Sequence, residues 1–235
     1  MQPPSPPTAE SPAARTLIVA NRLPVTIARG AGGWRVTPSA GGLATGLDCV
    51  HGSGGSQWIG WPGVTTEAEG RRRGELHALL ARRRLVPVWL GRAEFAGFYK
   101  RIANGVLWPA FHSLLEHLPL QIKDWGAYEA VNARFAEAVA AVWRPGDRIW
   151  VHDYHLLLLP ARLRALLPEA AIGFFLHIPF PTSEVFRALP HRERLLEGVL
   201  GADLVGFHTA AYARHFSSSL LRLLGLSAQV DRVQV

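Results

Sequence analysis

Hydrophobic residues in this chain fall into short runs that alternate with longer amphipathic stretches. We predict strands at the runs 16–21, 57–61, 85–90, 148–151, 171–176 and 203–207. Between them apolar residues recur at helical spacing, and we predict helices at 74–84, 125–143, 156–167, 190–200 and 210–224. Wholly apolar strands that alternate with helices are typical of an α/β fold, a parallel sheet with helices on both faces.

The length of the chain, 235 residues, favours one large domain. Residues 1–14 are rich in proline and lack the basic and apolar regions of a signal peptide, so we expect a disordered leader before a domain at 15–235. No apolar run approaches the ~20 residues that cross a bilayer, which predicts no membrane partner. Cys49 is the only cysteine, so no intrachain disulfide can form, and we expect a cytoplasmic protein.

The chain is basic, with a formal net charge of +7 and a pI of about 10.4. Nearly all of this charge is arginine, including the runs 71–73 and 82–84. A solvated basic face explains such runs most simply, and anionic substrates such as phosphates are the alternative. No aromatic-interleaved basic patch or known module accompanies the charge, so we expect no nucleic-acid partner.

Four of the predicted strands end in polar or ionisable side chains. In chain order these are Asn21 and Arg22, His152 and Asp153, His177, and His208. Ligands of open parallel sheets bind outside the carboxyl ends of the strands, at the point where the strand order reverses. His208 alone would be read as a structural residue, but four strands with the same ending predict a ligand site at this edge.

Two short motifs near these strand ends allow more than one interpretation. The segment 39–46, SAGGLATG, opens a short helical stretch whose backbone N–H groups suit phosphate oxygens, although a plain turn fits it equally well. His152, Asp153 and His155 are metal-ligand types, but the further clusters of a binuclear phosphoesterase are missing, and we expect no metal. Without a metal, Asp153 suits hydrogen bonds from sugar hydroxyls.

Several aromatic residues lie in glycine-containing or loop-like segments, where stacking on a sugar is an alternative to core packing. They are Trp58, Trp61, Tyr99 and Trp108.

Seven segments together resemble the trehalose-6-phosphate synthase family. They are ANRLP, SAGGLATGL, WIGWPG, FYKRIANGVLWPAFH, WVHDYHLLLLP, GFFLHIPFPTSEVFRALP and LLEGVLGADLVGFHT, and the similarity runs from about Thr16 to Phe216. The resemblance implies a GT-B glycosyltransferase with two Rossmann-like domains, of which this chain is the N-terminal, acceptor-binding one. It also implies glucosyl transfer with retention from UDP-glucose to glucose 6-phosphate, giving trehalose 6-phosphate and UDP, with no metal or other cofactor.

The resemblance also implies roles for individual residues. Asp153 and His177 would be catalytic, Asp153 holding acceptor hydroxyls near the reacting centre and His177 lying by the donor sugar. The acceptor glucose 6-phosphate would contact Arg22 through its phosphate, together with Trp61, Tyr99, Trp108 and Asp153. The donor UDP-glucose would contact His177 and the backbone of Gly41 and Gly42.

The chain stops at Val235, about where the first domain of that family gives way to the second. The residues that bind UDP-glucose in the second domain have no counterpart, so we expect the isolated chain to be inactive. Its partner would be the missing C-terminal domain or a full-length homologue, with a homo-oligomer as a further alternative. Alternative functions are a glucosylglycerol-phosphate synthase or pseudo-glycosyltransferase of the same fold, or a non-catalytic half-protein that binds sugar phosphate.

Overall fold

The structure is a computed structural model that describes residues 14–30, 33–47, 50–51, 55–66, 73–229 and 232–233. Residues 1–13 of the predicted leader, Cys49, and the first two arginines of the run 71–73 lie outside the described residues.

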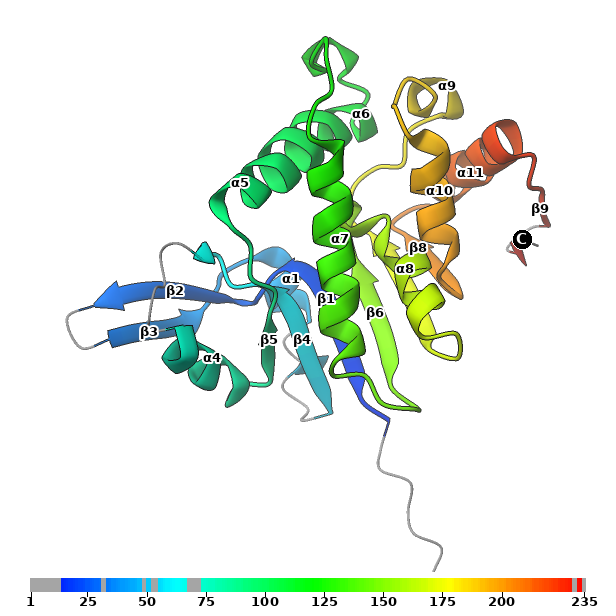
Figure 1. Cartoon of the computed structure of the whole chain (residues 1–235). Helices are drawn as coiled ribbons and strands as arrows, with labels where there is room; N and C mark the ends of the chain where they lie inside the picture. Colours follow the sequence, from blue (N-terminus) through cyan, green and yellow to red (C-terminus); the bar gives the residue numbers. More distant parts are fainter. Residues whose placement is uncertain are drawn as a thin grey trace, which may run out of the picture.

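A six-stranded parallel sheet forms the centre of the molecule (Figure 1). Its strands are β1 (Thr16–Arg22), β4 (Ser56–Trp61), β5 (Leu85–Pro87), β6 (Arg148–His152), β7 (Ala171–Leu176) and β8 (Leu204–Phe207). They lie in the order β5-β4-β1-β6-β7-β8. All six predicted strands are confirmed, but β5 ends at Pro87 rather than at residue 90. It is an edge strand, and proline has no N–H to continue a ladder.

Two antiparallel pairs of strands were not predicted. They are the hairpin of β2 (Val25–Gly30) with β3 (Gly33–Pro38), and the short β9 (Ala228–Gln229) with β10 (Arg232–Val233). In β2 and β3 only Val25 is buried, so the hairpin lacks the apolar run that marks a core strand.

Helices fill the segments between the strands. They are α1 (Gly42–Gly46), α4 (Arg73–Ala81), α5 (Arg92–Phe95), α6 (Trp108–Phe111), α7 (Trp125–Ala140), α8 (Leu159–Leu166), α9 (Ser183–Phe186), α10 (Arg192–Leu200) and α11 (Ala210–Ser219). Short 3-10 turns are η3 (Leu115–His117) and η4 (Tyr154–Leu156), and π-helices are η2 (Ala96–Leu107) and η5 (Leu220–Leu224). The five predicted helices correspond to α4, α7, α8, α10 and α11 with η5, with ends that shift by a few residues.

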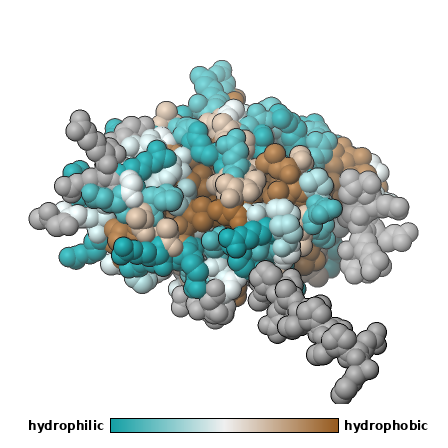
Figure 2. Space-filling model, turned by 60° about the horizontal axis from the view of Figure 1, so that its bottom comes forward, coloured by the Kyte–Doolittle hydropathy of each residue, from teal (hydrophilic) through white to brown (hydrophobic). Residues whose placement is uncertain are grey.

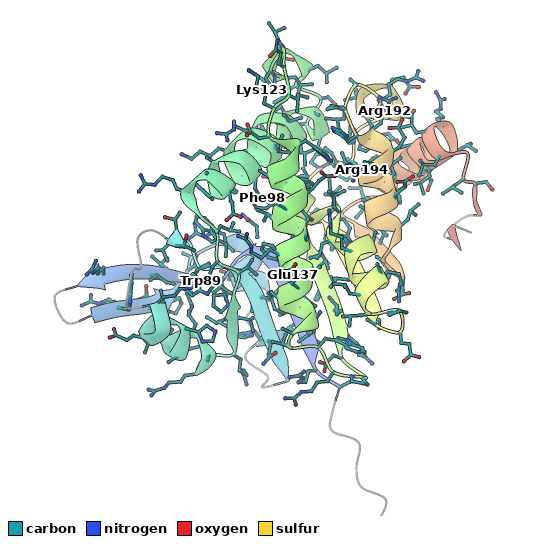
Figure 3. All side chains as sticks on the ribbon, in the orientation of Figure 1. Trp89, Phe98, Lys123, Glu137, Arg192 and Arg194 are labelled. Atoms are coloured by element: carbon teal, nitrogen blue, oxygen red, sulfur yellow. The ribbon has the colours of Figure 1, made fainter. Side chains whose placement is uncertain are left out.

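Tyr99 and Trp108, expected in glycine-containing or loop-like segments, lie in helices and not in loops. Residues 92–111 are almost continuously helical through α5, η2 and α6. Gly97, Gly105 and Pro109 weaken the helical signal in this segment. The helix nevertheless forms because its apolar side, which includes Phe98 (Figure 3), is buried against α7. Phe98 stacks on Tyr128 of α7 with ring centroids 5.8 Å apart.

Two hydrophobic cores cover the two faces of the sheet. On one face α7, α8, α10 and η2 pack over β1, β6 and β7; on the other, α4 and the β2–β3 hairpin pack over β1, β4 and β5. The bottom of the molecule, where the strands begin, shows hydrophobic atoms across its middle (Figure 2). Leu204 of the edge strand β8 is 73% exposed. No described helix is long and apolar enough to cross a membrane.

The connections along the chain place a switch point at the middle of the sheet. From β1 the chain adds β4 and then β5 on one side, and afterwards β6, β7 and β8 on the other. The strand order therefore reverses between β1 and β6, which pair directly. In open α/β sheets the crevice outside the carboxyl ends of such a pair is the usual ligand site. Here these ends carry Arg22 and Asp153.

Candidate functional site

A cavity of about 250 Å³ lies at the carboxyl ends of β1 and β6. Its lining includes Asn21, Arg22, Gly41, Gly42, Trp58, His152, Asp153 and His155. Four of the residues to which the family resemblance assigns a role, Arg22, Gly41, Gly42 and Asp153, therefore share one cavity.

The guanidinium group of Arg22 is held between neighbours that fix its position at the cavity. It lies 5.0 Å from the ring centre of Trp61 and also contacts Gly63. Gly63 has a φ of +89°, and a Cβ atom at this position would collide with the guanidinium. The Arg22 side chain is exposed and forms no ion pair with any residue that the structure describes. The fold thus orients an uncompensated cation at the cavity.

A row of stacked rings connects this arginine with His155, another residue that lines the cavity. Trp61 stacks on Phe95 with ring centroids 4.3 Å apart, Phe95 on Tyr99 at 5.0 Å, and Tyr99 on His155 at 5.5 Å. Because His155 lines the cavity, the row places Trp61 and Tyr99 beside it. The stacking covers much of the ring faces, and Trp61 is only 5% exposed.

Trp108 does not belong to the row of stacked rings. It is not among the lining residues, its side chain is 39% exposed, and it stacks on His112 with ring centroids 4.0 Å apart. His112 Nδ1 donates a 2.7 Å hydrogen bond to the carbonyl oxygen of Trp108. His112 is near enough to Asp153 to influence the pKa of that carboxyl.

Asp153 is held in a costly backbone conformation. Its φ of 74° and ψ of 168° lie in a region that residues with a side chain rarely adopt. Its Oδ1 accepts a 3.2 Å hydrogen bond from the backbone N–H of His177. Burial raises the pKa of this carboxyl to about 6, against the opposing effect of the N–H groups of Tyr154 and His177. Strain of this kind clusters at functional sites, and here it fixes a carboxylate at the cavity.

The histidines at the strand ends converge as the sequence predicts. His152 Nδ1 and His177 Nε2 are 3.0 Å apart, and the rings of His177 and His208 have centroids 5.6 Å apart. Burial, with a further effect of His177, lowers the pKa of His152 to about 3. Burial and His208 lower the pKa of His177 to about 4. Both rings are therefore neutral at pH 7, and His177 is joined to the cavity through His152 and Asp153.

Several polar atoms of the cavity residues are buried without a hydrogen-bond partner in the described part of the chain. These are Asn21 Oδ1, His152 Nε2, and both ring nitrogens of His155. Burial lowers the pKa of His155 to about 3, so its ring is also neutral at pH 7. Buried polar groups are nearly always paired, so this cluster sets the cavity residues apart from an ordinary apolar core.

Three contributors to the site were not identified from the sequence. Gly63 follows Pro62, a dipeptide that signals a turn and could have been examined for a positive φ. Phe95 and His112 belong to the helical segment 92–111 or follow it directly, and they were missed with that segment. Among the described residues, no group of three or more His, Cys, Asp or Glu side chains could hold a metal ion.

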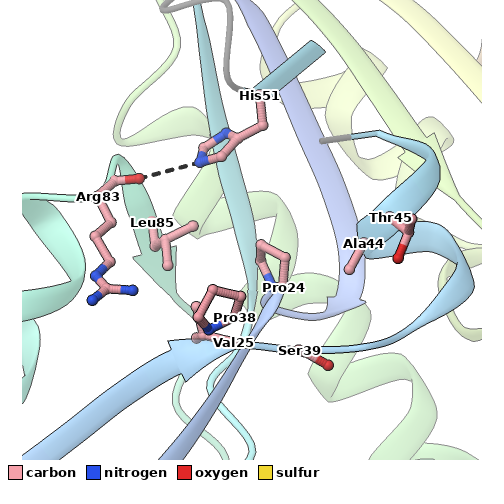
Figure 4. A pocket seen from close by; sticks show the side chains of 9 residues that line it. All are labelled: Pro24, Val25, Pro38, Ser39, Ala44, Thr45, His51, Arg83 and Leu85. Atoms are coloured by element: carbon pink, nitrogen blue, oxygen red, sulfur yellow. Dashed lines mark hydrogen bonds between the residues drawn. The ribbon is translucent and has the colours of Figure 1, made fainter. Parts of the chain in front are cut away.

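A second hollow, of about 370 Å³, lies beside the cavity and shares Pro24, Ser39 and Ala44 with it (Figure 4). Its histidine, His51, is already engaged on both ring nitrogens. Nε2 donates to the carbonyl oxygen of Arg83 at 3.2 Å, and Nδ1 lies 3.1 Å from Ser56 Oγ. In this respect His51 differs from His155, whose two ring nitrogens have no partner in the described part of the chain.

Comparison with known proteins adds an independent line of evidence. Residues 14–235 match the model of glycosyltransferase family 20. A bifunctional trehalose-6-phosphate synthase/phosphatase from Thermoproteus tenax is 43% identical over 232 residues, which cover 94% of this chain and 31% of that protein. An alpha,alpha-trehalose-phosphate synthase (UDP-forming) from Yarrowia lipolytica is 43% identical over 219 residues, covering 89% of this chain and 46% of the relative.

A solved structure is similar as well. The alpha,alpha-trehalose-phosphate synthase (UDP-forming) from Burkholderia xenovorans in complex with glucose-6-phosphate has a TM-score of 0.74 and 33% identity. The similarity covers 92% of this chain and 45% of that one. The chain thus spans less than half the length of each of these relatives.

Proposed function

Because this chain belongs to glycosyltransferase family 20 and has the expected GT-B fold, we propose that it is the acceptor-binding part of a trehalose-6-phosphate synthase. In this proposal the complete enzyme transfers glucose from UDP-glucose to glucose 6-phosphate. The chain supplies the acceptor cavity, and the groups that bind most of the donor lie in sequence that corresponds to the rest of the longer relatives.

One observation carries the proposal: the guanidinium-bearing Arg22, which forms no ion pair with a described residue, and the strained Asp153 line the same cavity. Arg22 would bind the phosphate, because charge-assisted hydrogen bonds from arginine suit phosphate oxygens. Asp153 would accept hydrogen bonds from hexose hydroxyls, for which its pKa of about 6 leaves it ionised at pH 7 and above. The glucose-6-phosphate in the Burkholderia xenovorans structure supports this class of ligand.

The reaction breaks the bond between the anomeric carbon of glucose and the diphosphate of UDP, and it forms a bond to a hydroxyl oxygen of the acceptor. Asp153 would orient the acceptor hydroxyls, while His177 and the backbone of Gly41 and Gly42 would face the donor. The leaving diphosphate gains negative charge, which cations of the remaining part of the enzyme would stabilise. We propose that no metal takes part.

Calorimetric titration of the chain with glucose 6-phosphate and with glucose tests the phosphate contact. Charge-assisted hydrogen bonds contribute roughly 1.5–3 kcal/mol each, so Arg22→Ala should weaken glucose 6-phosphate binding about ten- to a hundredfold. The affinity for glucose should hardly change. Arg29→Ala, which removes an exposed arginine of β2, is the matched control and should leave both affinities unchanged.

Equal losses for glucose 6-phosphate and glucose in Arg22→Ala would show that Arg22 does not bind the phosphate. Loss of affinity in Arg29→Ala would attribute the effect to overall charge instead of the cavity.

A further inference from the structure

The His152 side chain lies between the cavity and the neighbouring histidine. It is fully buried, it lines the cavity, and its Nδ1 lies 3.0 Å from Nε2 of His177. Its other nitrogen, Nε2, is buried without a hydrogen-bond partner in the described part of the chain. The two nitrogens of an imidazole point away from each other, so the His152 ring connects His177 with the cavity.

The tautomer of His152 determines the tautomer of His177. Both rings are neutral at pH 7, because burial lowers the pKa of His152 to about 3 and that of His177 to about 4. A neutral imidazole has one donor and one acceptor nitrogen, so one ring must donate to the other. If His152 donates from Nδ1, His177 accepts at Nε2 and must carry its own proton on Nδ1.

The reverse arrangement is disfavoured by burial. It would place the proton of His152 on Nε2, where the N–H would be buried without an acceptor. A buried donor without a partner costs free energy, and orphaned N–H groups are rare in folded proteins. The bare lone pair that the first arrangement leaves at Nε2 is instead suited to a ligand hydroxyl in the cavity.

We propose that His152 is a positioning residue that holds His177 in its Nδ1–H tautomer and presents its own Nε2 lone pair to a hydroxyl of the bound acceptor. His177 thereby keeps an N–H donor on the side turned away from His152. The acceptor hydroxyl stabilises the same tautomer of His152, so occupancy of the cavity reinforces the arrangement. The contact with the acceptor rests on the proposed function, whereas the tautomer of His177 does not.

Nitrogen-15 NMR of the histidine-labelled chain at pH 7.5 tests the tautomers directly, because it separates protonated from bare ring nitrogens. In the ligand-free chain, His152 and His177 should both carry the proton on Nδ1. In His152→Leu the protonated nitrogen of His177 should change in most molecules to Nε2. In His152→Asn the side-chain amide N–H lies near the position of Nδ1 and should restore the Nδ1–H tautomer. Wild-type and His152→Asn spectra suffice if His152→Leu does not fold.

A wild-type spectrum in which Nε2 of His177 carries the proton would overturn the proposal. The same labelled chain is then titrated with glucose 6-phosphate, which should shift the Nε2 resonance of His152 as its lone pair accepts a hydroxyl. Binding without such a shift would overturn the contact with the acceptor. Absence of binding would overturn the proposed function and that contact together, while the ligand-free spectrum still decides the tautomer.

Discussion

At the scale of single residues, the backbone conformation of Asp153 destabilises the fold while it holds the carboxylate at the cavity. Its φ of 74° is unfavourable for any residue with a Cβ atom, and strain of this kind costs about 1–3 kcal/mol. We predict that the unfolding free energy of Asp153→Gly is about 1–3 kcal/mol higher than that of Asp153→Ala. At most positions the glycine variant would be the less stable protein. Both variants should lose affinity for glucose 6-phosphate.

Urea unfolding of both variants measures this difference, since each lacks the carboxylate and they differ only in the Cβ atom. An alanine variant as stable as the glycine variant would show that position 153 is not strained.

Burial of His155 makes the unfolding free energy of the chain depend on pH. Its pKa is about 3 in the folded chain and about 6.5 when unfolded, so below pH 6.5 the unfolded chain binds the additional proton. Its contribution to stability is therefore complete above pH 6.5 and is lost progressively as the pH falls toward 3. His152 and His177 act in the same direction, whereas Asp153, whose pKa is raised to about 6, opposes them.

We predict that His155→Phe makes the fall of unfolding free energy between pH 6 and pH 4 shallower by about 1.4 kcal/mol per pH unit. Urea titrations across this range measure the slope, and His117→Phe, at an exposed position, shows the effect of the substitution itself. An unchanged slope in His155→Phe would mean that His155 is accessible to protons in the folded chain.

At the scale of elements, the strands were predictable and their surroundings were less so. The runs that became β1, β6 and β7 have apolar centres. A parallel sheet brings their carboxyl ends to one edge, so Arg22, Asp153 and His177 could be grouped from sequence order alone. The helical segment 92–111 was missed because glycine and proline interrupt its pattern, while its stability comes from burial against α7. Stacking of Tyr99 on His155 depends on that tertiary packing and has no local signal.

The turn after β4 shows how an element can control a functional side chain. Gly63 has a positive φ, and its missing Cβ leaves room for the Arg22 guanidinium. We predict that Gly63→Ala lowers the unfolding free energy by about 1–3 kcal/mol and, by displacing Arg22, weakens glucose 6-phosphate binding about tenfold. Thermal unfolding and calorimetric titration measure the two effects.

Gly146→Ala is the matched control, because Gly146 has a φ of +91° but no atom lies within 4 Å of its missing Cβ. It should lose stability and keep its affinity. Unchanged affinity in Gly63→Ala as well would show that Arg22 binds the phosphate without support from this turn, or does not bind it.

At the scale of the whole molecule, the topology explains why the cavity lies where it does. The chain builds the sheet outward from β1 in both directions, so the connections diverge between β1 and β6 and leave a crevice above their carboxyl ends. The described part of the chain supplies the sheet, both helical layers and the Arg22–Asp153 cavity. Its longer relatives in glycosyltransferase family 20 have roughly as much sequence again or more.

The most direct test of this account is a crystal structure of the chain with glucose 6-phosphate bound. We predict electron density for the phosphate within hydrogen-bonding distance of the Arg22 guanidinium, and for the hexose in the cavity, with a hydroxyl bonded to Asp153. The neighbouring hollow lined by His51 and Arg83 (Figure 4) is the built-in comparison and should remain free of ligand. A phosphate bound in that hollow, or a hexose without contact to Asp153, would contradict the account.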